Sequence, residues 1–327
     1  MPVIDSHVHL FGPKYAGTVG WQYYVRTSAQ LAKRTDLSLE EISRKKMARW
    51  ADPEGTALLE EMDAAGIDRA IINVIDLGLD PAINQPIYDG EPIDEENKRV
   101  AMIAKKHPNR LSAIFGIDPR RGSYAMELFE RAVKEWGMVG LKILANPGFD
   151  ISDKYCYRIY QKAIELGVPR VFLHVGSEPF GYIKGTSMAS VDEVASDFPE
   201  ITFIVCHRGL GGAYDVEIVG YMKTNVYFDM AARLATAMFR RNQVTGSVLD
   251  TLYKPLRYFV DVLSTPKILY GSDWPTHRGI RRVTMAEQVK ALREPPEEVR
   301  EAGYALTEDE LEAILWKNAA KIFKLEV

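Results

Sequence analysis

Eight short apolar segments alternate with helical segments along this chain, and this succession limits the fold most strongly. The apolar segments are rich in β-branched residues and almost continuously hydrophobic, which is typical of parallel strands buried on both faces. These expected strands are Val3–Asp5, Ala70–Val74, Leu111–Phe115, Val139–Ile143, Val171–Val175, Thr202–Cys206, Val226–Asp229 and Ile268–Gly271.

Helical segments separate the expected strands. The clearest are Pro53–Ala65, Glu95–His107, Tyr124–Trp136, Tyr155–Leu166, Val191–Phe198 and Val248–Val262, and a last helix begins with a capping-box pattern at Thr307. Eight β-then-α units predict a single (β/α)₈ TIM barrel over residues 1–327. An open doubly wound sheet is the alternative. Such a sheet usually carries a glycine-rich turn after its first strand, which this sequence lacks.

The amino-acid composition limits which kinds of molecule the protein can be expected to bind. The net charge of −4 and the isolated basic clusters argue against a nucleic-acid or anionic-membrane surface. No apolar run reaches the roughly 18 residues of a membrane span, and the first residues do not form a signal peptide. The two cysteines, Cys156 and Cys206, are expected to be free thiols. We therefore expect a cytoplasmic protein with a small-molecule substrate, and a homo-oligomer stays possible.

A long connection from Phe11 to Asp52 follows the first strand. It exceeds the usual length of a βα loop, and in a barrel it would lie over the catalytic face. It carries Trp21, Tyr23 and Tyr24, so it either shapes a substrate pocket, with Tyr24 as a substrate-binding residue, or is structural padding.

Histidines and one aspartate stand at the ends of four expected strands. His7 and His9 are two residues apart at the end of the first strand, so both imidazoles can face one ion. This pair alone could be a polar rim. His174 ends the fifth strand, His207 the sixth, and Asp273 follows the eighth. The carboxyl edge of a barrel is where catalytic groups lie, so the set indicates a divalent-metal site.

These motifs together resemble the amidohydrolase superfamily. The residues that carry the resemblance are Asp5-Ser6-His7-Val8-His9, the histidines after strands five and six, and Gly271-Ser272-Asp273-Trp274-Pro275. The likeness is to the amidohydrolase 2 branch of mononuclear hydrolases and non-oxidative decarboxylases, such as aminocarboxymuconate semialdehyde decarboxylase. It covers essentially the whole chain.

The resemblance implies a role for each matching residue. It implies that His7, His9, His174 and Asp273 are the metal ligands, with Asp273 also catalytic. It implies that His207 is the catalytic residue beside the activated water or substrate carbonyl. Three imidazoles and one carboxylate suit one zinc ion, although manganese and iron also fit.

Other residues are weaker candidates for substrate binding. Lys142 near the end of strand four is expected to face the substrate or form a salt bridge. In binuclear relatives a carboxylated lysine there bridges two metals, which is the alternative. Arg208, Arg233 and His277 either bind an anionic substrate group or line the rim. Cys206 should point away from His207 as a small core residue.

Three functions are compatible with such a site. The first is a metal-dependent hydrolase that uses a metal-activated water on a small carbonyl substrate, an anionic lactone or amide. The second is a non-oxidative decarboxylase of a small aromatic or muconate-type acid. The third is a non-catalytic metal-binding barrel. The related decarboxylases often carry an acid after the strand-six motif, where this chain has His207-Arg208-Gly209-Leu210, and the opening motif is lactonase-like. Both points favour hydrolysis.

Overall fold

The computed structural model describes residues 1–12, 38, 40–41, 44, 50–79, 86, 91–176, 181–182, 185–208, 213–241, 247–276 and 283–326. Within these ranges eight strands form one sheet in sequence order, and each pairs with the next in parallel. They are β1 (Ile4–Val8), β2 (Arg69–Asn73), β3 (Leu111–Gly116), β4 (Leu141–Leu144), β5 (Arg170–His174), β6 (Thr202–Val205), β7 (Val226–Asp229) and β8 (Ile268–Leu269).

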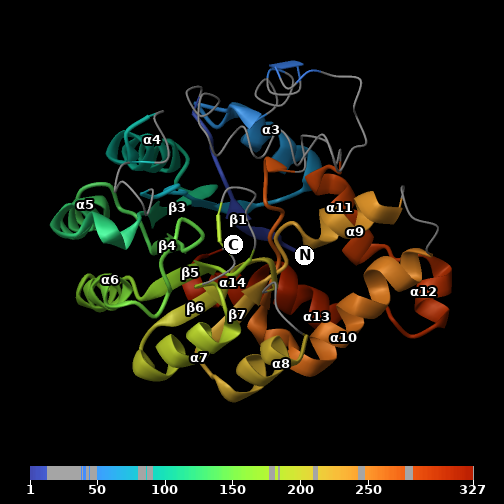
Figure 1. The fold of residues 1–327 in the computed structure, drawn as a ribbon. Coiled ribbons are helices and arrows are strands. Elements are labelled where there is room, and N and C mark those ends of the chain that lie inside the picture. Colours follow the sequence, from blue (N-terminus) through green and yellow to red (C-terminus); the bar gives the residue numbers. More distant parts are fainter. Residues whose placement is uncertain are drawn as a thin grey trace.

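The sheet closes between β8 and β1. Val8 forms a parallel bridge with Trp274. The backbone N–H groups of Ser6 and His9 donate to the carbonyl oxygens of Tyr270 and Trp274 at 3.0 and 2.7 Å. Figure 1 shows the strands at the centre and the helices around them. The TIM barrel predicted from the sequence is therefore confirmed.

Helices follow the strands around the barrel (Figure 1). They are α3 (Thr56–Ala65), α4 (Ile93–Lys106), α5 (Ser123–Lys134), α6 (Lys154–Glu165), α7 (Met188–Asp197), α8 (Ala213–Met222), α9 (Arg233–Arg241), α10 (Lys254–Leu263), α11 (Met285–Arg293), α12 (Glu297–Glu301), α13 (Glu308–Glu312) and α14 (Asn318–Phe323). π turns at Leu249–Tyr253 and Ala313–Lys317 run into α10 and α14. Within the described ranges, every helix is too short or too polar to cross a bilayer.

Among the strand ends that differ from the sequence prediction, two bear on the histidines. β1 continues to Val8 and not only to Asp5, so His7 lies inside the strand, where the pairing register with β2 shifts. β6 ends at Val205, and Cys206–Arg208 form a 3₁₀ turn in which His207 has a φ of 59°. This left-handed backbone is uncommon for a residue other than glycine. Both differences change where the histidine rings lie.

Apolar side chains fill the lower part of the barrel. Each of several strands contributes one residue to this inner core, and α14 adds two more that close one end; the members include Ile4, Ile71, Ile114, Phe172, Ile204, Leu269, Ala319 and Phe323. The rings of Phe172 and Phe323 stack with centroids 6.0 Å apart. Because this end is filled, the polar groups of the strands gather at the opposite, carboxyl end.

Candidate metal centre

The two-residue period of the strands builds the polar layer above the inner core. Two positions after an inward-facing apolar residue comes a buried polar one on the same face. The pairs are Ile71 and Asn73 on β2, Phe172 and His174 on β5, Ile204 and Cys206 after β6, and Tyr227 and Asp229 on β7. Asn73 and Asp229 were not among the sequence candidates, although this alternation could have indicated both.

His7 and His9 are held by hydrogen bonds at their Nδ1 atoms. Nδ1 of His7 lies 2.6 Å from Asp229 Oδ2, and Nδ1 of His9 lies 2.6 Å from the Asn73 carbonyl oxygen. Burial lowers the pKa of His7 to about 3, and Asp229 is ionised because His7 outweighs the effect of burial and lowers its pKa to about 2. Both rings therefore have an acceptor at Nδ1, which turns Nε2 of each ring toward the shared space.

The two Nε2 atoms face each other, which tests whether a metal fits. The Nε2 atoms of His7 and His9 are 3.1 Å apart, and Asp273 Oδ1 lies 3.9 and 3.4 Å from them. Burial opposes ionisation of Asp273, but His9, His207 and His7 outweigh it and hold its pKa well below the usual range. Two imidazole nitrogens and a carboxylate oxygen that converge in this way fit a divalent cation.

The loop after β8 positions Asp273. Its φ is 62°, and its backbone N–H donates to the His7 carbonyl oxygen at 2.9 Å. The Thr276 hydroxyl donates to Asp273 Oδ2 at 2.8 Å, which leaves Oδ1 toward the histidines. Asp5 ties this loop to β1, because its Oδ1 accepts from the N–H groups of His7 and Ser272 at 3.1 and 3.0 Å.

His174 and His207 form a second pair beside the first. His174 Nδ1 lies 3.2 Å from His207 Nε2, and the rings of His7 and His207 are 5.2 Å apart between centroids. His207 Nδ1 lies 3.1 Å from the Ala231 carbonyl oxygen. Burial lowers the pKa of both rings. The trio His7, His9 and Asp273 converges most tightly, and His174 adjoins it through His207, so its ligand role stays a prediction.

Lys142 and Cys206 lie inside the barrel. Lys142 is 2 % exposed, and its Nζ donates to Cys206 Sγ at 2.8 Å and lies 3.4 Å from His7 Nε2. Cys206 is a buried core residue, as predicted. The His207 ring also lies inside the barrel, near His7, because the chain leaves β6 at Val205 and turns. His7, Cys206 and Asp229 form a second possible cation group, but the lysine amine already contacts its thiol.

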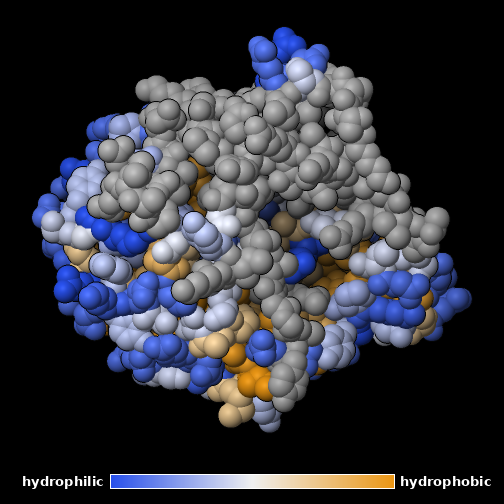
Figure 2. Space-filling view, viewed as in Figure 1, coloured by the Kyte–Doolittle hydropathy of each residue, from blue (hydrophilic) through white to orange (hydrophobic). Residues whose placement is uncertain are grey.

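The remaining sequence candidates lie apart from the trio or outside the described residues. Arg233 Nε donates to the His207 carbonyl oxygen at 2.8 Å. Arg233 also lines a cavity of about 420 Å³ between α9 and α10, where Figure 2 shows hydrophobic colour in a depression of the surface. Arg208 lies in the turn after β6, but its side chain is not described, and His277 and Tyr24 fall outside the described residues.

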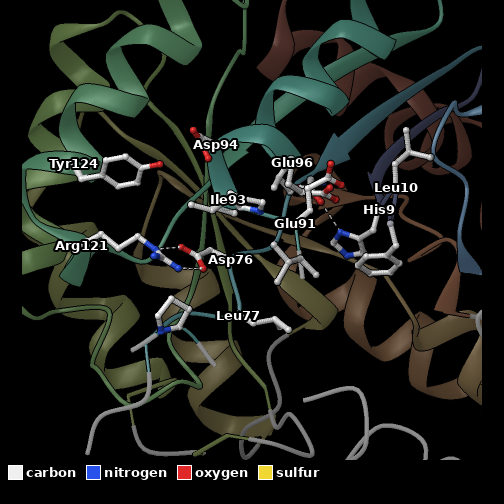
Figure 3. Close-up of a pocket in the computed structure, with 16 residues that line it drawn as sticks. His9, Leu10, Asp76, Leu77, Glu91, Ile93, Asp94, Glu96, Arg121 and Tyr124 are labelled. Carbon is white, nitrogen blue, oxygen red and sulfur yellow. Dashed lines mark hydrogen bonds and ion pairs between the residues drawn. The ribbon is translucent and has the colours of Figure 1, made fainter. Parts of the chain in front are cut away.

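A second cavity, of about 370 Å³, opens beside His9. Figure 3 shows it extending from His9 past Glu91 and Asp76 to Arg121 and Tyr124. The sequence did not indicate this cavity, because its walls come from loops after β2 and β3 and from the start of α4. The metal position thus has open space on one side, as a catalytic site requires.

The chain is similar to proteins of known activity. A curated relative, 2-keto-4-carboxy-3-hexenedioate hydratase of Sphingobium sp. (strain NBRC 103272 / SYK-6), is 25 % identical over 161 residues. That match covers 44 % of this chain and spans about half of the relative, 46 %.

Solved structures share the fold. A 5-carboxyvanillate decarboxylase from Novosphingobium aromaticivorans, complexed with manganese and 4-hydroxy-3-methoxy-5-nitrobenzoic acid, is 17 % identical with a TM-score of 0.67, covering 99 % of this chain and 96 % of that one. A probable 2-pyrone-4,6-dicarboxylic acid hydrolase from Acinetobacter baumannii, with citric acid bound, is 15 % identical with a TM-score of 0.59, covering 99 % and 100 %.

A family model that matches almost the whole sequence shows the family to which the chain belongs. The family model for amidohydrolases matches residues 4–325, which include every residue of the buried metal trio and both partners of its Nδ1 atoms. The resemblance read from the strand-end motifs is therefore confirmed, and the chain belongs to the amidohydrolase family.

Proposed function

We propose that this enzyme is a metal-dependent hydrolase of a small carbonyl compound, a lactone or an amide. The observation that carries the proposal is the position of the His207 ring beside the trio His7, His9 and Asp273, with its centroid 5.2 Å from that of His7. A hydrolase needs both a metal ligand set and a neighbouring group that moves a proton. A non-catalytic metal-binding barrel does not account for membership of this enzyme family.

The chain's residues divide the work as follows. A divalent ion held by His7, His9, Asp273 and, in this proposal, His174 would polarise a carbonyl and lower the pKa of water. His207 donates from Nδ1 to the Ala231 carbonyl, so the lone pair lies on Nε2, which faces His174 Nδ1 at 3.2 Å and would accept a proton and return it. Asp273 stays ionised and can hold the attacking water through Oδ1, while Thr276 fixes Oδ2. We propose zinc, because imidazole and carboxylate ligands suit it.

Decarboxylation is the second candidate. The shared fold with a manganese-containing 5-carboxyvanillate decarboxylase supports it, since the same centre could polarise an acid for loss of CO₂. Hydrolysis is favoured because the turn that carries His207 continues as Arg208-Gly209-Leu210, without the acid common in the related decarboxylases. An anionic substrate group would be held by arginine, and Arg233 is the described candidate.

A parallel activity screen tests the proposal. The metal-loaded enzyme is given lactones and amides with acid release measured, aromatic and muconate-type acids with CO₂ measured, and 2-keto unsaturated acids with loss of ultraviolet absorbance measured. Hydrolysis is the expected activity. CO₂ release or hydration, with no lactone or amide turned over, would refute the hydrolase assignment.

The His207→Ala variant then tests the role of the ring. It should keep its metal and lose about 10²–10⁴-fold in kcat, the range for a positioned acid–base group. His174→Ala is the matched comparison, because it removes a neighbouring ring of the same kind and should lose metal. If His207→Ala is folded but purifies without metal, His207 is a ligand and the assigned role is wrong.

A further inference from the structure

The cavity beside His9 has walls of unusual chemistry. Four carboxylates line it, from Asp76, Glu91, Asp94 and Glu96, and one guanidinium, from Arg121. Figure 3 shows these side chains around the space that begins at His9. Any group of a metal-bound substrate that extends toward α4 would enter this space.

The guanidinium groups nearby are already engaged. Arg121 holds Asp76 through two hydrogen bonds, Nε to Oδ2 at 2.7 Å and Nη2 to Oδ1 at 2.9 Å. Arg99, behind the wall, donates to both oxygens of Glu96 at 2.7 and 3.2 Å and lies 3.9 Å from Glu91. Neither arginine is therefore available to receive a substrate carboxylate.

The described walls keep an excess of negative charge. Four carboxyl groups face the guanidinium groups of Arg121 and Arg99, so the acidic groups outnumber the basic ones by two. Asp94 and Glu96 stand in the first turn of α4, whose N-terminus offsets only about half a charge. Burial raises the pKa of Glu96, and the charge of Glu91 raises it as well, against the effect of Arg99. A cation in the cavity would relieve this crowding.

An independent observation concerns a buried acceptor in the same wall. Asn73 lines the cavity and is 1 % exposed. Its amide nitrogen donates to the carbonyl oxygens of Ser6 and Ile71 at 3.3 and 3.2 Å, which fixes the amide orientation. Among the described residues nothing donates a hydrogen bond to its Oδ1. A buried acceptor without a donor is costly, so this atom calls for a ligand that donates.

We propose that the cavity beside His9 is a substrate subsite for a hydrogen-bond-donating group, preferring an ammonium to a neutral tail and excluding a carboxylate. The inference rests on the proposed function, since it takes the substrate's reacting carbonyl to lie at the metal. The proposal places a positive charge at the end of the substrate that lies away from the reacting carbonyl, which the sequence alone did not indicate. An anionic group, where the substrate has one, belongs on the Arg233 side of the centre.

Matched metal-binding probes test the subsite without turnover. Hydroxamic acids bind divalent ions, so we would compare three series that differ only at the tail, with an ammonium, a methyl or a carboxylate after two to five methylenes. Dissociation constants for the zinc-loaded enzyme come from calorimetry. At the best length the ammonium probe should bind about 10–100-fold more tightly than the carboxylate probe, and the ratio should shrink at high salt.

Two variants locate the effect. Removing charge from the wall with Asp94→Asn combined with Glu91→Gln should reduce the ammonium preference to about threefold or less and leave the methyl probe unchanged. Glu60→Gln, which removes an exposed acid from α3, should leave the ranking as in the wild type. Equal affinities of the three series at every length, or tightest binding of the carboxylate, would overturn the proposal. If the ranking holds and no lactone or amide is hydrolysed, the subsite stands and the hydrolase assignment fails.

Discussion

Asp229 provides the sharpest test of how the centre is built. Its Oδ2 accepts from His7 Nδ1 at 2.6 Å, and its Oδ1 accepts from the N–H groups of His207 and Ala231 at 2.8 and 3.0 Å. Asp229→Asn keeps the shape and replaces one oxygen by a donor. In one orientation the new amide faces the Nδ1–H of His7, and in the other it faces two backbone N–H groups.

Either orientation places donor against donor. The ring of His7 can relieve the conflict by moving its proton to Nε2, but that nitrogen then loses the lone pair that faces His9 and the metal position. Losing such a partner of a ligating histidine typically costs 10–100-fold in metal affinity. We therefore expect Asp229→Asn to bind zinc about 10–100-fold more weakly, or about 1.4–2.7 kcal/mol.

A competition titration with a chromogenic chelator measures this change at fixed pH. Thermal unfolding with and without zinc gives a second readout, because weaker binding raises Tm less at the same zinc concentration. Asp118→Asn is the matched control: it alters another buried aspartate, which binds Arg120 and the Leu79 N–H. It should change stability and leave zinc affinity within about twofold. Zinc affinity of Asp229→Asn within twofold of wild type would refute the reasoning.

Three further predictions test other parts of the structure. Elemental analysis of protein purified without chelator should find about one divalent ion per chain, because the Lys142 amine already contacts the second cation group; two ions at full occupancy would make Lys142 a bridging ligand. Gly116→Ala should lower the free energy of unfolding in urea by at least about 2 kcal/mol, since its Cβ would meet the Val74 carbonyl oxygen at 2.0 Å; an unchanged midpoint would contradict the packing. Hydrogen bonds from Arg257 lower the pKa of Glu310 in the folded protein. They therefore add to the free energy of unfolding above the pKa of Glu310 in the unfolded chain, near 4.5, and this contribution is lost as the pH falls. Glu310→Gln should accordingly cost about 0.5–1 kcal/mol at pH 7 and almost nothing at pH 3, and an equal cost at both would exclude the ion pair.

Strand periodicity explains why the fold and the histidines could be predicted. Short apolar runs, each followed by a helix, identify a parallel barrel, and its carboxyl edge must be where His174, His207 and Asp273 lie. Backbone irregularities escaped prediction. The register shift in β1 and the positive φ of His207 are set by tertiary packing, so the positions of the His7 and His207 rings could not be read from strand alternation.

The hydrogen-bond partners of the proposed ligands were harder to predict than the strand-end positions of the histidines. A histidine at a strand end is conspicuous, whereas Asp229 looks like the ordinary last residue of a strand until its neighbours are known. The cavity walls were beyond prediction, because Asp76 and Asp94 lie in a long loop and a helix start whose relative positions depend on the packed barrel. The residues next to Asp76 and Asp94 in the sequence do not indicate that both side chains line the same cavity.

Asp229 binds the ring of His7 through one oxygen and the backbone N–H of His207 through the other. In the proposed mechanism, ligand geometry and proton-transfer geometry would therefore depend on the same residue. A change there would disturb both, which leaves little freedom to tune the reaction at the metal itself. The four acids of the cavity beside His9 come from the loop after β2 and from the start of α4 and its preceding residues, away from β7 and the turn after β6, so these positions can vary separately. Differences in substrate among barrels with this centre would then arise mainly in those walls, where α4 and the loops after β2 and β3 meet.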